Sequence, residues 1–134
     1  MMTTTVNLIR KNANGSYQFL TSAFPSYCVM TQGQFETLIG ELEKLKLAPS
    51  FARDLPIARF PDFEGLYKTT RIDIRKDFDG YLLASNMHGD FLCRMNESQF
   101  DQLIKELIEL RDLVSCAAKM PEVYFPDFTY EVTG

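Results

Sequence analysis

The chain is poor in the residues that build metal sites and proton-transfer sites. Its 134 residues include a single histidine, His88, and three cysteines, Cys28, Cys93 and Cys116. No Cys-x-x-Cys pair occurs, so the chain can hardly supply the histidine and cysteine ligands of a structural zinc site. We therefore expect reduced, buried thiols, and neither a bound metal nor a cofactor.

Long apolar stretches are also absent. No run approaches the roughly 18 residues that cross a membrane. Residues 1–10 lack the basic flank and the apolar stretch of a secretory signal. We expect a cytoplasmic protein without a membrane contact.

Basic charge is scarce in the chain. Lysine and arginine number 14 against 18 acidic residues, which gives a formal net charge of −4. A protein that coats nucleic acid needs a basic surface, so direct nucleic-acid binding is not expected. Residues 1–65, the first half, carry 6 basic and 6 acidic side chains, and residues 66–134, the second half, carry 8 and 12. The excess negative charge therefore lies in the second half.

What the sequence does contain is an internal repeat. Residues 6–63 and 71–128 match at a constant offset of 65 residues (6 to 71, 63 to 128), with no insertion. Four matches in one register predict a tandem duplication. The matched pieces are 9–15 with 74–80, Cys28 and Met30 with Cys93 and Met95, 34–45 with 99–110, and 60–63 with 125–128.

The first part of each repeat predicts a three-stranded antiparallel sheet. Residues 12–15 and 77–80 have the form Asx-x-Asx-Gly, in which glycine takes the positive φ that a bulged hairpin loop requires. Cys28 and Met30 stand two positions apart and share one face of a strand, as do their counterparts. The expected strands are 5–11, 16–22 and 26–31 in the first repeat and 70–76, 81–87 and 91–95 in the second.

Each repeat continues into a helix with one apolar face. Thr31-x-x-Gln34 and Asn96-x-x-Gln99 are capping-box sequences, which predict where the two helices begin. Apolar residues then recur at helical spacing. These predicted buried positions are 35, 38, 39, 42 and 45 in the first repeat and 100, 103, 104, 107 and 110 in the second.

Prolines limit the helices, and symmetry suggests how the repeats assemble. The first helix must end before Pro49, whereas the second is expected to continue toward Cys116. A last strand is expected at 128–132. One unit of about 60 residues is marginal alone, so two units should bury their apolar faces against each other. The predicted fold is α+β: a tandem duplication of a β-β-β-α unit, fused into one pseudo-two-fold domain over residues 1–134.

Two short motifs carry candidate chemistry. Asp77-x-Asp79-Gly80 resembles part of a calcium loop, but the position of its glycine fits a turn and not an EF-hand. His88 is the only imidazole, and hence the only neutral-pH proton shuttle of the chain. No Cys-His or Ser-His-Asp arrangement adjoins it. We therefore expect a protein that is not an enzyme, with a catalyst that uses His88 as an alternative.

Two other repeated features are interpreted as structural. The basic pairs at 10–11 and 75–76 are expected to be solvated charges at strand ends, with contact to phosphates or an acidic partner as the alternative. The Phe-Pro-Asp-Phe segments at 60–63 and 125–128 are expected to clamp a loop onto the core. An aromatic contact site, present twice, is the alternative reading of these segments.

Part of the first repeat is similar to a known family. The residues concerned are Gly15, Tyr17, Phe24, Pro25, Gln32 and Gly33, followed by a helix. With these, residues 15–45 resemble the HicB-type antitoxin domain, a small β-β-β-α module. The second repeat departs from this pattern, with Gly89-Asp90 where the first repeat has Phe24-Pro25.

The differences between the repeats supply the functional hypothesis. Five of six compared positions in the hairpin and helix start gain a negative charge in the second repeat. We expect this acidic face to dock on a basic patch of a protein partner; a surface that only keeps the protein soluble is the alternative. The predicted partner-binding residues are Asp73, Asp77, Asp79, Asp90, Glu97 and Asp101.

The expected function is therefore that of a small, acidic, non-enzymatic binding protein. Inhibitors, antitoxins, immunity proteins and phage anti-defence proteins such as anti-CRISPR proteins are of this kind, and a basic nucleic-acid-handling protein is one partner that would fit. A sponge or sensor that binds a small molecule or nucleotide at the repeat interface is the alternative. We expect a monomer or a homodimer.

Overall fold

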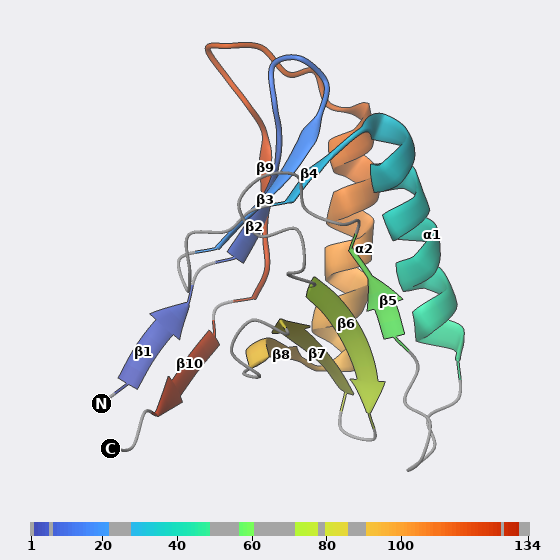
Figure 1. Cartoon of the computed structure of the whole chain (residues 1–134), viewed down its shortest axis with the longest axis vertical. Helices are drawn as coiled ribbons and strands as arrows, with labels where there is room; N and C mark the ends of the chain where they lie inside the picture. The colour runs from blue at the N-terminus through green and yellow to red at the C-terminus, as the bar shows by residue number, and fades with distance from the viewer. Residues whose placement is uncertain are drawn as a thin grey trace.

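The structure is a computed structural model of the chain. Within the residues that it describes, the fold is α+β, with two helices and two antiparallel four-stranded sheets (Figure 1). The described residues are 2–5, 7–21, 28–48, 57–60, 72–77, 80–85, 91–126 and 128–131.

The first sheet joins one hairpin and a third strand to a strand from the far end of the chain. β2 (Asn7–Lys11) pairs with β3 (Tyr17–Thr21), and β3 pairs with β4 (Cys28–Met30). The free side of β2 pairs with β9 (Glu122–Tyr124), so the order is β4-β3-β2-β9. The fourth strand therefore comes from the second half.

The second sheet is built from the corresponding strands. β6 (Ile72–Asp77) pairs with β7 (Gly80–Ser85), and β7 pairs with β8 (Phe91–Met95). β5 (Ile57–Arg59), from the first half, pairs with the other side of β6. The order β5-β6-β7-β8 thus also includes a strand from the opposite half.

The two exchanged strands pair in the same register. Ile9 faces Val123 across β2 and β9, and Ile74 faces Ala58 across β6 and β5. These four side chains are all buried. Because each half gives a strand to the sheet of the other, neither sheet is complete within one half.

The helices confirm the predicted pattern. α1 (Gln32–Leu47) and α2 (Glu97–Asp112) both begin with a complete capping box, and the ten predicted stripe positions are all buried. Figure 1 shows the helices side by side, with the sheets packed against them. The described helices include none that is long and apolar enough to cross a membrane.

The hairpin turns confirm the predicted backbone but not the predicted register. Gly15 has φ +88° and Gly80 has φ +143°. Lys11 pairs with Tyr17 across the first hairpin. Lys76, 65 positions later (76 minus 11), pairs with Tyr81, which is only 64 positions after Tyr17 (81 minus 17). The constant offset of 65 is therefore wrong for β7.

The physical reason is a turn that is shorter by one residue in the second half. Four residues (77–80) separate the paired Lys76 and Tyr81, whereas five (12–16) separate the paired Lys11 and Tyr17. A bulge between Leu83 and Ala84 then shifts the pairing, and Met95 returns to the offset of 65 from Met30 (95 minus 30). β-Bulges insert one residue in this way without disturbing the rest of a ladder.

Beyond the second helix, two predictions are wrong. α2 ends at Asp112, because Leu113 is its extended C-cap and does not continue the helix toward Cys116. Cys116 is exposed, since it lies in a turn where its backbone pairs with Lys119, and it is not a buried thiol. The side chains of Cys28 and Cys93 lie outside the described residues.

The chain ends meet in a two-stranded ribbon. β1 (Met2–Thr5) pairs with β10 (Phe128–Glu131), which confirms the predicted last strand. Figure 1 shows this ribbon beside the second sheet, where β10 contacts β8.

Candidate functional site

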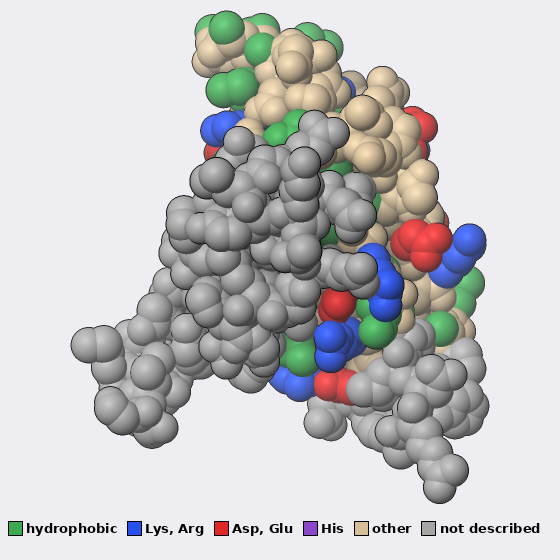
Figure 2. All heavy atoms as spheres, viewed as in Figure 1, with side chains coloured by type: hydrophobic (Ala, Val, Ile, Leu, Met, Phe, Trp, Pro, Cys, Tyr) green, Lys and Arg blue, Asp and Glu red, His purple; other side chains and the backbone are tan. Residues whose placement is uncertain are grey.

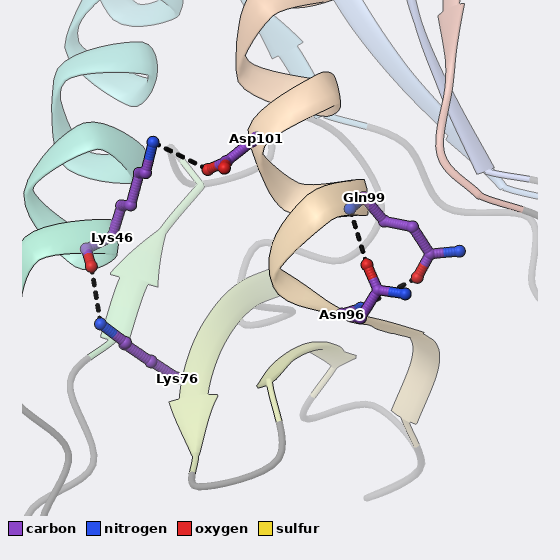
Figure 3. A network of polar contacts seen from close by, with 5 residues as sticks. All are labelled: Lys46, Lys76, Asn96, Gln99 and Asp101. Atoms are coloured by element: carbon purple, nitrogen blue, oxygen red, sulfur yellow. Dashed lines mark hydrogen bonds and ion pairs between the residues drawn. The ribbon is translucent and has the colours of Figure 1, made fainter.

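A lysine from the second half closes the end of α1. The Lys76 ammonium on β6 donates hydrogen bonds to Lys46 O at 2.6 Å and Ala48 O at 2.7 Å; Figure 3 shows the first of these. The last carbonyls of a helix find no N–H donor within the helix, so another group must donate to them. A cation at this end also complements the helix dipole. The end of α1 is thus held by the opposite half.

Lys11 has the same role at the end of α2. Its ammonium donates to Arg111 O at 2.8 Å and Leu113 O at 2.6 Å. The prediction of solvated strand-end charges is therefore wrong for Lys11 and Lys76, because each ammonium binds two carbonyls of a helix end.

Each capping lysine also covers a tyrosine that packs on a helix. Lys11 Nζ lies 5.6 Å from the ring centroid of Tyr17, and that ring stacks on Phe35 with centroids 3.8 Å apart. In the second half, Lys76 lies over Tyr81, which stacks on the corresponding phenylalanine of α2. Burial raises the pKa of both tyrosine hydroxyls above the ordinary value.

The antiparallel helices are also joined by a surface ion pair. Lys46 near the end of α1 lies 2.9 Å from a carboxylate oxygen of Asp101 near the start of α2 (Figure 3). The hydrogen bond to Asp101 raises the pKa of the Lys46 ammonium. Both side chains are partly exposed, so the pair contributes little to stability.

Several predicted partner-binding carboxylates are bound within the chain. Asp73 is nearly buried and lies 3.0 Å from Arg75 Nε. Asp77 lies 3.0 Å from Arg94, and Asp101 contacts Lys46.

Of the other three predicted carboxylates, one is among the described residues and two are not. Glu97 is exposed in the first turn of α2. Asp79 and Asp90 lie outside the described residues. The structure thus places the described members of the set on two elements, β6 and α2.

The outer face of the second sheet alternates basic and acidic groups. Figure 2 shows blue and red side chains interleaved over β5 and β6. Arg59 stands opposite Asp73 in the strand register, but the Asp73 carboxylate forms an ion pair with Arg75. The neighbouring row across the four strands is Ile57, Arg75, Leu82 and Arg94.

A groove of about 610 Å³ lies between α1 and β5. Thr31 Oγ1 and Gln34 Oε1 accept the two hydrogen bonds of the capping box, at 3.2 and 2.9 Å. The Gln34 amide nitrogen and the Thr31 hydroxyl hydrogen are therefore left as donors. The groove is lined by Thr31, Gly33, Gln34, Thr37, Leu38 and Arg59.

A second groove of about 360 Å³ occupies the corresponding place between α2 and β9. Here Tyr124 stands where the first groove has Arg59, and Glu106 adds a carboxylate. The Tyr124 hydroxyl donates a hydrogen bond to a Glu122 carboxylate oxygen at 3.2 Å. The negative charge of Glu122 raises the pKa of the Tyr124 hydroxyl. The two grooves therefore share a location but differ in charge.

The described parts of the Phe-Pro-Asp-Phe segments lie against the core. Phe60 and Phe125 are buried, and both contact the edge or face of Phe19, with centroids 5.2 and 5.9 Å apart. This agrees with a clamp at these two positions. The side chains of Phe63 and Phe128, like His88 and its surroundings, lie outside the described residues.

The roles of the capping lysines and of Arg59 were not predicted from the sequence. Lys11 and Lys76 could have been found, because identical basic residues at matched positions of both repeats indicate a shared structural role. Arg59 has no such signal, because its counterpart is Tyr124 and its groove depends on the packing of α1 against β5. Comparison with protein-family models, curated proteins and solved structures finds no match.

Proposed function

We propose that the protein is a non-enzymatic binding protein whose acidic second half occupies the basic surface of a partner protein. In this proposal the chain arose as a fused duplication. Both halves have the order of three strands, one helix and one exchanged strand, and α1 and α2 are related by the offset of 65 residues (97 minus 32). The reciprocal strands and lysine caps support a pseudo-two-fold domain.

Residues shared by the two halves serve the fold. Besides the capping lysines and the capping-box glutamines, the shared described residues are mostly buried. The buried identical pairs are Ile9/Ile74, Met30/Met95, Phe35/Phe100, Leu38/Leu103, Ile39/Ile104, Leu42/Leu107, Leu45/Leu110 and Phe60/Phe125. A role specific to this protein then belongs to the surface, where the halves differ.

The observation that carries the proposal is the charge of that diverged surface. The second half has 12 acidic and 8 basic residues, whereas the first half is balanced. At the start of α2, Glu97 is exposed and replaces Gln32 of the first half. Acidic surfaces of this kind accelerate association with basic partners, and salt screens the effect.

The ion pairs within the chain narrow the surface that is proposed to bind. Asp73 is nearly buried beside Arg75, so we assign it to the sheet and not to the contact. Asp77 and Asp101 share their charge with basic neighbours. The proposed contact therefore centres on Glu97, together with Asp79 and Asp90 of the sequence-based set.

The test uses matched baits in an affinity isolation from the native host. One bait is the wild-type protein, and the second has Asp77, Asp79, Asp90 and Glu97 changed together to Asn or Gln. A control bait removes four charges from the first half: Glu36, Glu41, Glu43 and Glu64 to Gln. A basic protein should be retained by the wild type and the control but not by the second-half variant.

Association rates then decide the mechanism. For the isolated partner, the second-half variant should associate more slowly and with a weaker dependence on salt, while circular dichroism shows an intact fold. Equal rates and equal salt dependence for all three proteins would contradict the proposed acidic contact.

A further inference from the structure

We propose that the groove between α1 and β5 binds an extended acidic segment of a partner protein, with Arg59 as the residue that holds its carboxylate. This site goes beyond the proposed function, because it lies in the first-half groove and selects the opposite charge.

Arg59 is a guanidinium without a partner in the described part of the chain. The other described arginines each have an ion pair or a side-chain hydrogen bond. The carboxylate opposite Arg59 in the strand register, Asp73, is bound by Arg75 at 3.0 Å. Among the described residues, nothing binds the five N–H donors of Arg59. A planar guanidinium binds a carboxylate through two parallel hydrogen bonds.

The rest of the groove favours an anion as well. The described lining residues include no carboxylate, and α1 has no acidic residue in its first turn. The capping box turns the oxygen of Gln34 toward Thr31 N, which leaves the Gln34 amide group as a further donor. The corresponding groove of the second half contains Glu106 and has Tyr124 in place of Arg59, so it provides an internal contrast.

The shape and the apolar parts of the site fit a peptide. A volume of about 610 Å³ lies within the roughly 300–1,000 Å³ of sites that bind small ligands and short segments. Ile57 and Arg59 are both exposed on β5, two positions apart and hence on one face. An extended segment can therefore place an apolar side chain on Ile57 and an acidic side chain, two residues along, on Arg59.

The experiment is an NMR titration of the ¹⁵N-labelled full-length protein. The probe is the peptide acetyl-Ser-Leu-Ser-Glu-Ser-amide, in which Leu and Glu stand two residues apart. It should cause saturable shifts of the backbone amides of Gly33, Gln34 and Arg59. The same peptide with Gln in place of Glu should bind at least about tenfold more weakly, because the charged hydrogen bonds are lost.

Protein variants assign the contact to Arg59. Arg59→Ala should weaken binding by at least about tenfold, and Arg59→Lys should retain part of it. Lys105→Ala, which removes an exposed positive charge from α2, should leave the affinity unchanged.

Each other outcome would overturn the inference. Equal binding of the Gln peptide would remove the role of the carboxylate, and equal shifts with sodium acetate would indicate a small-anion site. Shifts confined to other residues, or no shifts up to about 10 mM peptide, would exclude this groove as the docking site. The second-half charge variant keeps Arg59, so its result can fail independently.

Discussion

Replacing Lys76 by methionine should loosen the end of α1 and destabilise the whole domain. The substitution keeps a long apolar side chain, but it removes the ammonium, which lies 5.8 Å from the ring centroid of Tyr81. Lys46 O and Ala48 O, now bonded at 2.6 and 2.7 Å, would lose their charged donor.

The expected loss is about 1–2 kcal/mol in the free energy of unfolding. A hydrogen bond to a charged group contributes about 1.5–3 kcal/mol, and a cation at a helix C-terminus about 0.3–1 kcal/mol. These figures describe one contact and are not added. We take the lower part of the range because the bond to Lys46 O is exposed.

The partner substitution is Lys11→Met, which should cost a similar amount at the end of α2. The helices have 16 residues each, which is about 24 Å. Their caps lie at opposite ends of an antiparallel pair, so the two losses should add to about 2–4 kcal/mol in the double variant.

The assay is urea unfolding at pH 7, followed by circular dichroism. Lys44→Met is the control: Lys44 is a cation in the last turn of α1 itself, but its side chain is 80% exposed and lies 3.9 Å from Glu41. That variant should change stability by less than about 0.5 kcal/mol. If Lys76→Met and Lys11→Met both matched this control, the reciprocal caps would not stabilise the domain.

Three further predictions concern the turns, a buried tyrosine and the thiols. Gly80→Ala should cost at least about 2 kcal/mol, because its Cβ would clash with the Met95 carbonyl oxygen, whereas Gly15→Ala, with nothing within 4 Å, should cost only about 1 kcal/mol in the same unfolding assay. Because folding raises the pKa of Tyr17, the protonated hydroxyl contributes to the free energy of unfolding. This contribution is complete below the usual pKa of 10.0 and is lost as the pH rises through the higher pKa of the folded state. Tyr17→Phe should therefore flatten the decline of stability above about pH 10, and an unchanged decline would contradict this reading. A thiol reagent should label exposed Cys116 within the native state, and a Cys116→Ser variant should show no comparably fast labelling.

The helices could be predicted in detail because their signals are local. A capping box needs only residues three apart, and a buried stripe needs only helical spacing, so α1 and α2 start where Thr31 and Asn96 indicate. The end of α1 was also fixed locally, by Pro49. The end of α2 has no such local signal, because the next proline is Pro121.

The exchanged strands could not be predicted from local pattern. β5 and β9 have three residues each, too few for an alternation to be seen, and their partners are far away in sequence. The register shift of β7 could not be predicted for a related reason. Aligning Gly15 with Gly80 suggested equal turns, whereas pairing is set by where Tyr17 and Tyr81 stack on the helices.

Local sequence pattern was also insufficient to predict the candidate site. Composition located the excess of negative charge, but it could not foresee that Asp73 and Asp77 lie beside Arg75 and Arg94. The contact of Asp77 with Arg94 joins β6 to β8 and depends on the order of the strands in the sheet, whereas Asp73 and Arg75 lie two positions apart on β6 itself. Arg59, likewise, becomes a candidate only when α1 and β5 enclose a groove.

The reciprocal exchange of strands is tested most directly by NOEs between backbone protons in dilute, monomeric protein. The exchanged fold predicts cross-strand contacts of Ile9 with Val123 and of Ile74 with Ala58. A chain whose halves fold separately would instead give contacts of Ile9 with Ala58 and of Ile74 with Val123. Observing the first pair of contacts would support one interlocked domain, and observing the second pair would contradict it.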